Sequence, residues 1–321
     1  MKILKHIKRW YSIKKFILIS AFFSLNITLF MPLSLFSQGA VVGYADGNKR
    51  VNANNVTSFP TNAQLDKLTH VIAVGLGVYT SGALKKSDLP GSWNGNTNTW
   101  IASLVNRAHQ RGVKVSICIT GRSEFNSATS TQHKINAFVN EIASFVNANG
   151  LDGVDIDWER PGVDSNGDPL PYIQDQIKEW NQCTSLLVAL KSSLPNKRIT
   201  IAFPHGNWIY PNPTIQLDIW DTADLIHLMT YDVEDGVDGW PNHSNADYSI
   251  GGIDNWIPGG TPISYRKKLF LGCAFYGYKK NSHGNTLWGD RNKVSYVTYS
   301  GGGNYNHGDL PEDVQNKAIQ Q

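Results

Sequence analysis

Cysteine is scarce in this chain of 321 residues, which contains only three. Cys118, Cys183 and Cys273 are widely separated, stand in apolar segments and form an odd count. This pattern argues against the disulfide framework of a small secreted scaffold. We therefore expect buried thiols at these positions.

Charge is also scarce, because Asp, Glu, Lys and Arg make up 17% of the residues and the formal net charge is only +3. Six basic residues are concentrated in the first fifteen positions: Lys2, Lys5, Lys8, Arg9, Lys14 and Lys15. Without these six, the formal charge falls from +3 to −3, so the body of the chain is not basic. The sequence therefore predicts neither a nucleic-acid-binding nor a polybasic membrane-binding surface.

Two common signatures of cofactor use are missing. No Gly-rich phosphate loop follows a predicted strand and opens a helix, which argues against nucleotide binding. His205 has no partner at metal-ligand spacing, so we expect a polar cleft residue rather than a ligand. The sequence predicts no metal and no organic cofactor.

The basic start is followed by an uncharged apolar run over residues 16–36 and by small residues near 37–40. A positive start, an apolar middle and a small-residue end are typical of a secretory signal peptide. The run is also long enough to span a bilayer, so a retained anchor is the alternative, although Pro32 would weaken a transmembrane helix. We predict a cleaved signal peptide over residues 1–39 and a secreted, extracellular product.

Strand-like and helix-like segments alternate through the rest of the chain. Seven strands are predicted, at residues 41–44, 70–78, 114–120, 152–159, 199–203, 225–231 and 269–276. Clear amphipathic helices are predicted at residues 101–108, 135–146 and 177–190. Regular alternation implies a parallel sheet. The number of units favours an α/β fold of the (β/α)8 TIM barrel type over an open doubly wound sheet.

An eighth strand is not visible in the sequence. After Tyr278 the chain has a polar, Gly-rich stretch to about Gly308, followed by a helix that Pro311 would start well. We therefore predict that residues 40–321 form a barrel domain that lacks its eighth strand and is incomplete at the C-terminus.

The segment from Asp152 to Glu159 reads Asp-Gly-Val-Asp-Ile-Asp-Trp-Glu and is the most informative in the chain. Side chains alternate between the two faces of a strand, so Asp155, Asp157 and Glu159 share one face and the apolar residues share the other. Carboxylates about 6–7 Å apart along one face repel each other. Some of them must therefore hold and share protons near neutral pH, which costs stability and suits acid/base chemistry.

Two other interpretations of this segment are open. An acidic edge strand would accommodate the apolar residues, but the segment lies between two helical patterns, which favours a buried parallel strand. A calcium site normally takes its ligands from Gly- and Asn-rich turns rather than from a β-branched strand.

Polar and aromatic side chains follow the predicted strands: Asp46, Arg122, Glu124, Glu159, His205, Trp208, Tyr231, Asp232, Tyr276 and Tyr278. The active site of a parallel barrel lies at the carboxyl ends of its strands. We therefore expect these residues to gather around one mouth.

The acidic segment resembles the signature Asp-Gly-x-Asp-x-Asp-x-Glu of the family 18 glycoside hydrolases, the chitinase-like barrel enzymes, and matches every fixed position. Residues 229–232, Met-Thr-Tyr-Asp, are similar to the Met-x-Tyr-Asp of the family's sixth strand. Residues 269–277 and Thr69-His70 resemble its seventh and second strands. The third strand departs from the family's Ser-x-Gly-Gly, because residues 118–121 read Cys-Ile-Thr-Gly.

The resemblance implies a glycosidase that cleaves β-1,4-linked N-acetylglucosamine polymers such as chitin. It implies a retaining mechanism in which the substrate's own acetamido group is the nucleophile. In that mechanism Glu159 is the general acid and base, Asp157 orients the acetamido group, Asp155 tunes the pair, and Tyr231 donates a hydrogen bond to the acetamido oxygen.

Other residues near the mouth are predicted to bind the sugar chain: Asp232, Met229, Trp208, Tyr276 and Tyr44. Trp208 is the best candidate for stacking on a sugar ring, although core packing is an equally good interpretation of any single tryptophan. Trp158 lies on the apolar face of its strand, and we expect it to pack against a helix.

Two alternative functions stay open. An endo-β-N-acetylglucosaminidase acting on glycoprotein glycans would use the same carboxylates in a more open cleft. A non-catalytic, chitin-binding lectin-like protein would share the fold, but inactive relatives of this family usually lose the Glu that this chain retains at position 159. The expected partner is an N-acetylglucosamine-containing oligosaccharide in each case. No nucleic acid or nucleotide is expected, and a membrane only through an uncleaved N-terminal segment.

Overall fold

A computed structural model of the chain describes residues 40–47, 56–159, 161–162, 170–205, 213–232, 244, 246–256, 263–274, 276–279, 294–295 and 305–306. Residues 41–321 form one compact unit, distinct from residues 1–40. The predicted signal peptide, residues 1–39, lies outside the described residues. Among the residues that are described, no helix is long and apolar enough to cross a membrane.

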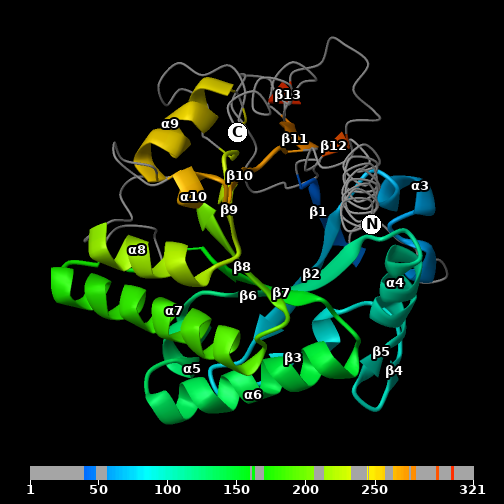
Figure 1. Cartoon of the computed structure of the whole chain (residues 1–321), viewed down its shortest axis with the longest axis horizontal. Coiled ribbons are helices and arrows are strands. Elements are labelled where there is room, and N and C mark those ends of the chain that lie inside the picture. Colours follow the sequence, from blue (N-terminus) through cyan, green and yellow to red (C-terminus); the bar gives the residue numbers. More distant parts are fainter. Residues whose placement is uncertain are drawn as a thin grey trace, which may run out of the picture. The chain divides into compact units, whose positions relative to one another are not determined.

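A curled parallel sheet of seven strands forms the centre of the unit (Figure 1). Its strands lie side by side in chain order: β1 Val42–Asp46, β2 His70–Val78, β6 Lys114–Gly121, β7 Gly153–Trp158, β8 Arg198–Pro204, β9 Leu225–Met229 and β10 Leu269–Leu271. Neighbours along this order are all parallel. The seven strands predicted from the sequence are present, which confirms the barrel-type α/β fold.

The two edges of this sheet are β1 and β10, which have one parallel neighbour each in the described part of the chain. No eighth parallel strand occurs among the described residues, in agreement with the sequence prediction. The helix predicted from Pro311 lies outside them. Short antiparallel strands make up the remainder: β3 Leu84–Lys85 beside β2, β4 Trp93–Asn94 with β5 Thr97–Asn98, and β11 Tyr276–Lys279 between β12 Val294–Ser295 and β13 Tyr305–Asn306.

Helices connect successive strands (Figure 1). The α-helices are α3 Asn62–Leu65, α4 Thr99–His109, α5 Ser123–Ala128, α6 Gln132–Ala148, α7 Ile173–Ser193, α8 Pro213–Thr222, α9 Ala246–Trp256 and α10 Ile263–Arg266, and the 3₁₀ turns are Val56–Ser58 and Lys86–Asp88. The three amphipathic helices predicted from the sequence correspond to α4, α6 and α7.

The boundaries of α6 follow from its sequence. Thr131 caps the amino end, because its side chain accepts a hydrogen bond from the backbone N–H of Lys134. The buried stripe consists of the predicted apolar positions: Ile135, Phe138, Val139, Ile142, Phe145 and Val146. After the helix, Gly150 adopts φ +64, a left-handed conformation that glycine reaches without strain. The chain can therefore turn sharply into β7.

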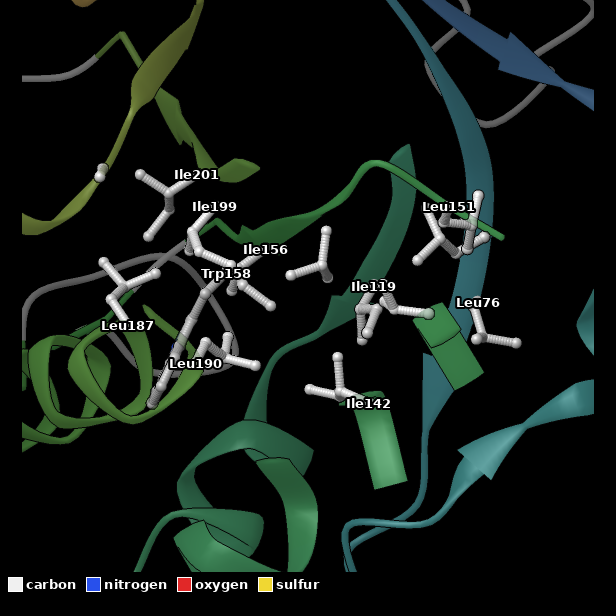
Figure 2. Packing of buried hydrophobic residues seen from close by; sticks show 14 of the residues in the cluster. Leu76, Ile119, Ile142, Leu151, Ile156, Trp158, Leu187, Leu190, Ile199 and Ile201 are labelled. Carbon is white, nitrogen blue, oxygen red and sulfur yellow. The ribbon is translucent and has the colours of Figure 1, made fainter. Parts of the chain in front are cut away.

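The apolar face of β7 packs on the helical layer, as predicted. Val154, Ile156 and Trp158 are at most 1% exposed. The Trp158 ring stacks on Phe125 of α5 with ring centroids 5.0 Å apart. Figure 2 shows Ile156 and Trp158 among Ile142 of α6 and Leu187 and Leu190 of α7. This packing holds one face of β7 against the helices, so the acidic face points into the barrel.

The glycine that starts β7 is required by close packing between strands. A Cβ atom at Gly153 would lie 2.2 Å from the backbone oxygen of Arg198 and 2.7 Å from Ser116 Oγ. Because the first of these atoms is backbone, it cannot move aside at low cost. Any larger residue would therefore separate β7 from β8 at the strand that carries the acids.

Two strands end earlier than the sequence predicts. The sixth predicted strand extends to Tyr231, but β9 ends at Met229, because Thr230 N–H bonds the Leu228 carbonyl and its hydroxyl donates to the Gly272 carbonyl. The seventh predicted strand, residues 269–276, is divided into β10 and β11. Tyr231 thus lies in the segment that follows β9 rather than within the strand.

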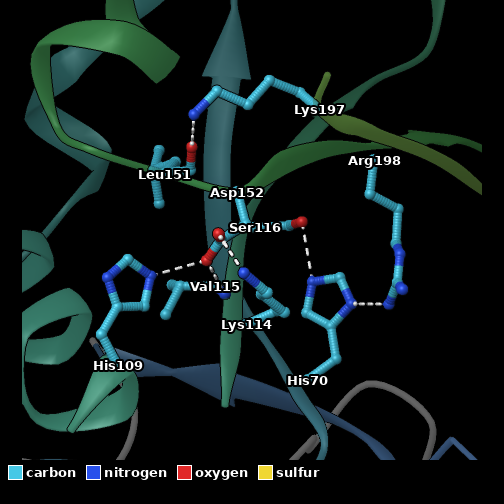
Figure 3. A network of polar contacts seen from close by, with 9 residues as sticks. All are labelled: His70, His109, Lys114, Val115, Ser116, Leu151, Asp152, Lys197 and Arg198. Atoms are coloured by element: carbon cyan, nitrogen blue, oxygen red, sulfur yellow. Dashed lines mark hydrogen bonds and ion pairs between the residues drawn. The ribbon is translucent and has the colours of Figure 1, made fainter. Parts of the chain in front are cut away.

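A polar network joins the amino-terminal ends of the strands (Figure 3). Asp152 accepts hydrogen bonds from the Val115 N–H at 2.9 Å, from His109 at 2.7 Å and from Lys114 at 3.2 Å. Burial alone would raise its pKa, but these hydrogen bonds outweigh burial and lower it. Asp152, the first acid of the signature, therefore has a structural role at the amino-terminal ends of the strands.

His70 is a buried member of this network. Its Nδ1 lies 2.9 Å from Arg198 Nη1 and its Nε2 lies 2.8 Å from Ser116 Oγ. Arginine only donates hydrogen bonds, so Nδ1 must accept and Nε2 must carry the hydrogen. A protonated ring would lose the bond from Arg198 and face its positive charge. The neutral form is therefore the one that fits the fold.

Lowering the pH is expected to destabilise the protein through His70. Burial, and then the charge of Arg198, lower the pKa of His70 from 6.5 to about 4. Unfolded His70 takes up a proton below pH 6.5, whereas folded His70 does so only near pH 4. The free energy of unfolding should therefore fall by about 3 kcal/mol as the pH drops from 6.5 to 4.

Urea unfolding of the wild type and of His70→Asn over this range measures the effect. Asn keeps an acceptor for Arg198 but does not titrate, so the variant should show a clearly smaller fall. His133→Asn, at an exposed position of α6, should behave like the wild type. Equal falls in the wild type and His70→Asn would show that other groups cause the pH dependence.

Candidate active site

Neighbouring strands place polar side chains in register with the acids of β7. Cys118 of β6 and Thr200 of β8 are the register partners of Asp155. Thr120 of β6 is a register partner of Asp157. Residues in register on neighbouring barrel strands point to the same side. Asp155 and Asp157 thus occupy successive layers of the barrel interior.

Asp155 is fully buried and well supplied with hydrogen-bond donors. Tyr44 Oη donates to its Oδ2 at 2.9 Å, Thr200 Oγ1 donates to its Oδ1, and His227 Nδ1 lies 3.4 Å from Oδ1. Burial alone would raise the pKa of Asp155. The interactions with His227, and then the bonds from Thr200 and Tyr44, outweigh burial and hold the pKa below its usual value.

Asp157 has the opposite environment. Its Oδ1 is buried and has no hydrogen-bond partner in the described part of the chain. Burial, and then the negative charges of Glu159 and Asp155, raise its pKa well above the usual value, against a smaller opposing effect of Arg122. The pKa values of the two aspartates therefore diverge: Asp155 favours the ionised form and Asp157 the protonated form.

Glu159 follows β7 directly and is the accessible member of the three. Its side chain is 35% exposed, and its Oε2 lies 3.4 Å from Nη2 of Arg122. Arg122 follows β6 and is itself 59% exposed, so this ion pair holds Glu159 only weakly. Glu159 can therefore meet a ligand at the mouth while Asp155 cannot.

Tyr231 and Asp232 follow β9 on the same side. Burial, and then the charges of Asp157 and Asp232, raise the pKa of Tyr231 well above its usual value, so its hydroxyl remains a donor. A Cβ at Gly272 would lie 2.6 Å from Cε1 of the Tyr231 ring, so this glycine makes room for the ring. Asp232 adopts φ 66, a left-handed conformation that is uncommon outside glycine.

Tyr44 of β1 lies partly in solvent and partly against the acid cluster, which consists of Asp155, Asp157 and Glu159. The residue is 46% exposed, yet its hydroxyl reaches inward to Asp155. Burial of the hydroxyl, and then the charge of Asp155, raise its pKa well above the usual value. Tyr44 thus donates to Asp155, and its predicted contact with substrate stays a prediction.

Three further predicted binding residues differ in how far the structure describes them. Met229 is the last residue of β9, pairs with Pro204 of β8 and is half-buried. Trp208 lies outside the described residues, and of Tyr276 only the backbone, at the start of β11, is described. Their predicted contacts with substrate also stay predictions.

His205 is a half-buried residue just after β8. Its Nε2 lies 2.5 Å from the Tyr248 carbonyl oxygen, and its ring stacks on that of Tyr248. Within the described ranges, no group of three or more His, Cys, Asp or Glu side chains is arranged to hold a metal ion.

Sequence reasoning missed three residues around Asp155. Thr200 and His227 were not singled out, and Cys118 was expected only to be a buried thiol. Cys118 and Cys183 are indeed buried free thiols, while Cys273 is half-buried. The missed signal was strand alternation: Thr200 is a polar residue at an inward position of β8, and His227 is one in β9.

A family comparison agrees with this geometry. The family model described as "Glycosyl hydrolases family 18" matches residues 40–318, nearly the whole chain. The chain therefore belongs to the glycosyl hydrolases of family 18.

Several individual relatives are chitinases by name, while another is named killer toxin subunits alpha/beta, from Kluyveromyces lactis. Endochitinase 1 of Metarhizium anisopliae is 24% identical over 293 residues, covering 79% of this chain and 66% of that protein. The secreted chitinase LysM12 of Penicillium expansum is 38% identical over 120 residues, covering 37% of this chain and 8% of that protein. The chain spans less than a tenth of the length of this relative and of two others.

Solved structures share the fold. A chitinase from Bacteroides thetaiotaomicron superposes with a TM-score of 0.66 at 21% identity, covering 88% of this chain and 85% of that one. A class V chitinase of Nicotiana tobaccum, solved in complex with NAG4, superposes with a TM-score of 0.55 at 19% identity, covering 75% of this chain and 68% of that one.

Proposed function

We propose that this protein hydrolyses β-1,4-linked N-acetylglucosamine polymers of the chitin type, with retention of configuration and with Glu159 as general acid and base. The opposite environments of Asp155 and Asp157 carry the proposal. A cluster of acids whose pKa values diverge in this way is suited to acid/base chemistry. Family membership and the chitinase names of the relatives support the substrate class.

The first step breaks the glycosidic bond. Glu159 donates its proton to the glycosidic oxygen, and the leaving sugar departs with that hydrogen. The carbonyl oxygen of the substrate's 2-acetamido group attacks the anomeric carbon from the other face and closes an oxazolinium ion. Tyr231 donates a hydrogen bond to the acetamido oxygen, and Asp157 orients the acetamido N–H.

The second step restores the enzyme. A water molecule attacks the anomeric carbon, Glu159 takes one of its protons, and the oxazolinium ring opens to the 2-acetamido group. Two inversions at one carbon give net retention. Asp155 stays ionised beneath Asp157 and Glu159, and its negative charge favours the proton on Asp157.

We further propose that five residues contact the sugar chain at the mouth: Asp232, Met229, Trp208, Tyr276 and Tyr44. Exposed aromatic rings and carboxylates are the groups that bind pyranose faces and hydroxyls. No metal or organic cofactor enters the proposed reaction.

Release of short oligosaccharides from colloidal chitin tests the proposal, with a high-mannose glycoprotein and a chitin pull-down in parallel. The proposal predicts chito-oligosaccharides and an intact glycan. Cleavage of the glycoprotein alone would favour an endo-β-N-acetylglucosaminidase. Binding to chitin without turnover would favour a lectin-like protein.

We propose that residues 1–39 are a secretory signal peptide and that residues 40–321 are the catalytic domain. The Lys-rich start and apolar run support this, and one relative is named a secreted chitinase. Expression in a secreting host should give a medium fraction whose first residue lies near Ala40, as measured by N-terminal sequencing. A membrane-bound product that still begins at Met1 would contradict it.

A further inference from the structure

His227 is a buried ring that the proposed reaction does not use. It lies in β9, is 6% exposed and pairs in register with Ala202 of β8 and Phe270 of β10. Its ring meets those of Tyr44 and Phe270 edge to face, with centroids 5.6 and 5.9 Å apart. The ring therefore packs between Tyr44 and Phe270, beside Asp155.

The hydrogen bonds around His227 fix the order of the protons. Nδ1 lies 2.5 Å from Tyr44 Oη, and that hydroxyl lies 2.9 Å from Asp155 Oδ2. A carboxylate only accepts, so the single Tyr44 proton points to Asp155. The hydroxyl oxygen then accepts from His227, which places a hydrogen on Nδ1. The result is a directed chain from His227 through Tyr44 to Asp155.

The other ring nitrogen of His227 takes no part in this hydrogen-bond chain. Nε2 is buried and has no hydrogen-bond partner among the described residues. Nδ1, in contrast, also lies 3.4 Å from Asp155 Oδ1, so it faces both the hydroxyl and the carboxylate. The ring thus acts on the acid cluster through one atom.

Charged and titratable groups on the neighbouring strands determine which electrostatic interactions His227 can make. Tyr44 faces it from β1 and Asp155 from β7. His70 of β2 lies near enough for electrostatic interaction, with Arg198 of β8 bonded to it. Cys118 of β6 lies against Asp155 itself. The only negative charge in direct contact with His227 among the described residues is therefore Asp155.

We propose that His227 is a positioning residue for the hydrolytic site: with Tyr44 it orients Asp155 and keeps it ionised, so that the exchangeable proton stays on Asp157 beside Glu159. This inference rests on the proposed function. It explains why a basic ring is buried beside a carboxylate that substrate does not reach.

Two substitutions separate positioning from packing. His227→Phe keeps a ring but removes the donor, while His227→Asn places an amide where Nδ1 lies. Without the donor, Asp155 should bind a proton at higher pH, so the acidic limb of the kcat profile should move up by about one pH unit. We expect kcat to fall about 10-fold in His227→Phe with little change in KM, and to recover largely in His227→Asn. His133→Phe, on the exposed face of α6, is the control.

NMR tests the inference without an activity assay. In the wild type, ¹⁵N shifts should show a hydrogen on Nδ1 of His227. In ¹³C-aspartate-labelled protein, the titration midpoint of Asp155 should rise by about one unit in His227→Phe. A bare Nδ1, or an unchanged Asp155 midpoint and kcat profile in folded His227→Phe, would overturn the inference. Wild-type protein that lacks hydrolytic activity but shows these NMR results would instead contradict the proposed function alone.

Discussion

Glu159→Gln is expected to abolish turnover of a fluorogenic chitobioside, with a loss in kcat of about 10³-fold or more. Gln cannot donate a proton to the glycosidic oxygen and cannot take one from water, so both steps fail. The side chain is 35% exposed and weakly paired with Arg122, so the change should leave the fold and substrate binding intact. Fluorescence release, together with binding of chito-oligosaccharides by calorimetry, measures both effects.

Glu124→Gln is the matched control. Glu124 lies in the first turn of α5, accepts a hydrogen bond from the backbone N–H of Arg122 at 3.2 Å and lies 3.8 Å from Lys85 Nζ, so it is another carboxylate near the mouth. Its loss should leave kcat within the same order of magnitude. Near-normal turnover in Glu159→Gln would show that another group donates the proton.

Asp157→Asn is expected to lower kcat by about 10²-fold. Asp157 is the acid whose pKa is raised, by burial and then by Glu159 and Asp155, so it holds a proton that an amide cannot supply or accept. The fold should tolerate the change, because Asn has nearly the same shape and needs no counter-charge. Steady-state kinetics over a pH series should show the loss at every pH.

Asp152→Asn is the control from the same segment. Asp152 lies before β7 in the network with His109 and Lys114, away from the carboxyl ends of the strands. This variant should lose stability to urea and keep kcat. A larger loss of kcat in Asp152→Asn than in Asp157→Asn would contradict the assigned roles.

Much of the fold follows from local sequence patterns. Alternation of apolar and acidic residues placed Trp158 on the helical side of β7 and Asp155 on the inner side, and the structure confirms both. Helical periodicity identified the buried stripe of α6. These features depend on the geometry of single elements, which a sequence specifies directly.

The different protonation states of Asp155 and Asp157 could not be predicted in the same way. Spacing indicated repulsion and shared protons, but not which carboxyl is ionised. That depends on Tyr44, Thr200 and His227, which reach Asp155 from strands far away in the sequence. Only the curling of the sheet brings these strands together. The early end of β9 likewise depends on a tertiary bond, from Thr230 to the Gly272 carbonyl.

Titration of ¹³C-labelled aspartates, assigned with Asp155→Asn and Asp157→Asn, tests the central claim most directly. Asp157 should keep its proton well above 3.8, the ordinary pKa of an aspartate, while Asp155 should stay ionised below that value. Two signals that titrate together near 3.8, or an Asp155 that takes up its proton before Asp157, would contradict the account.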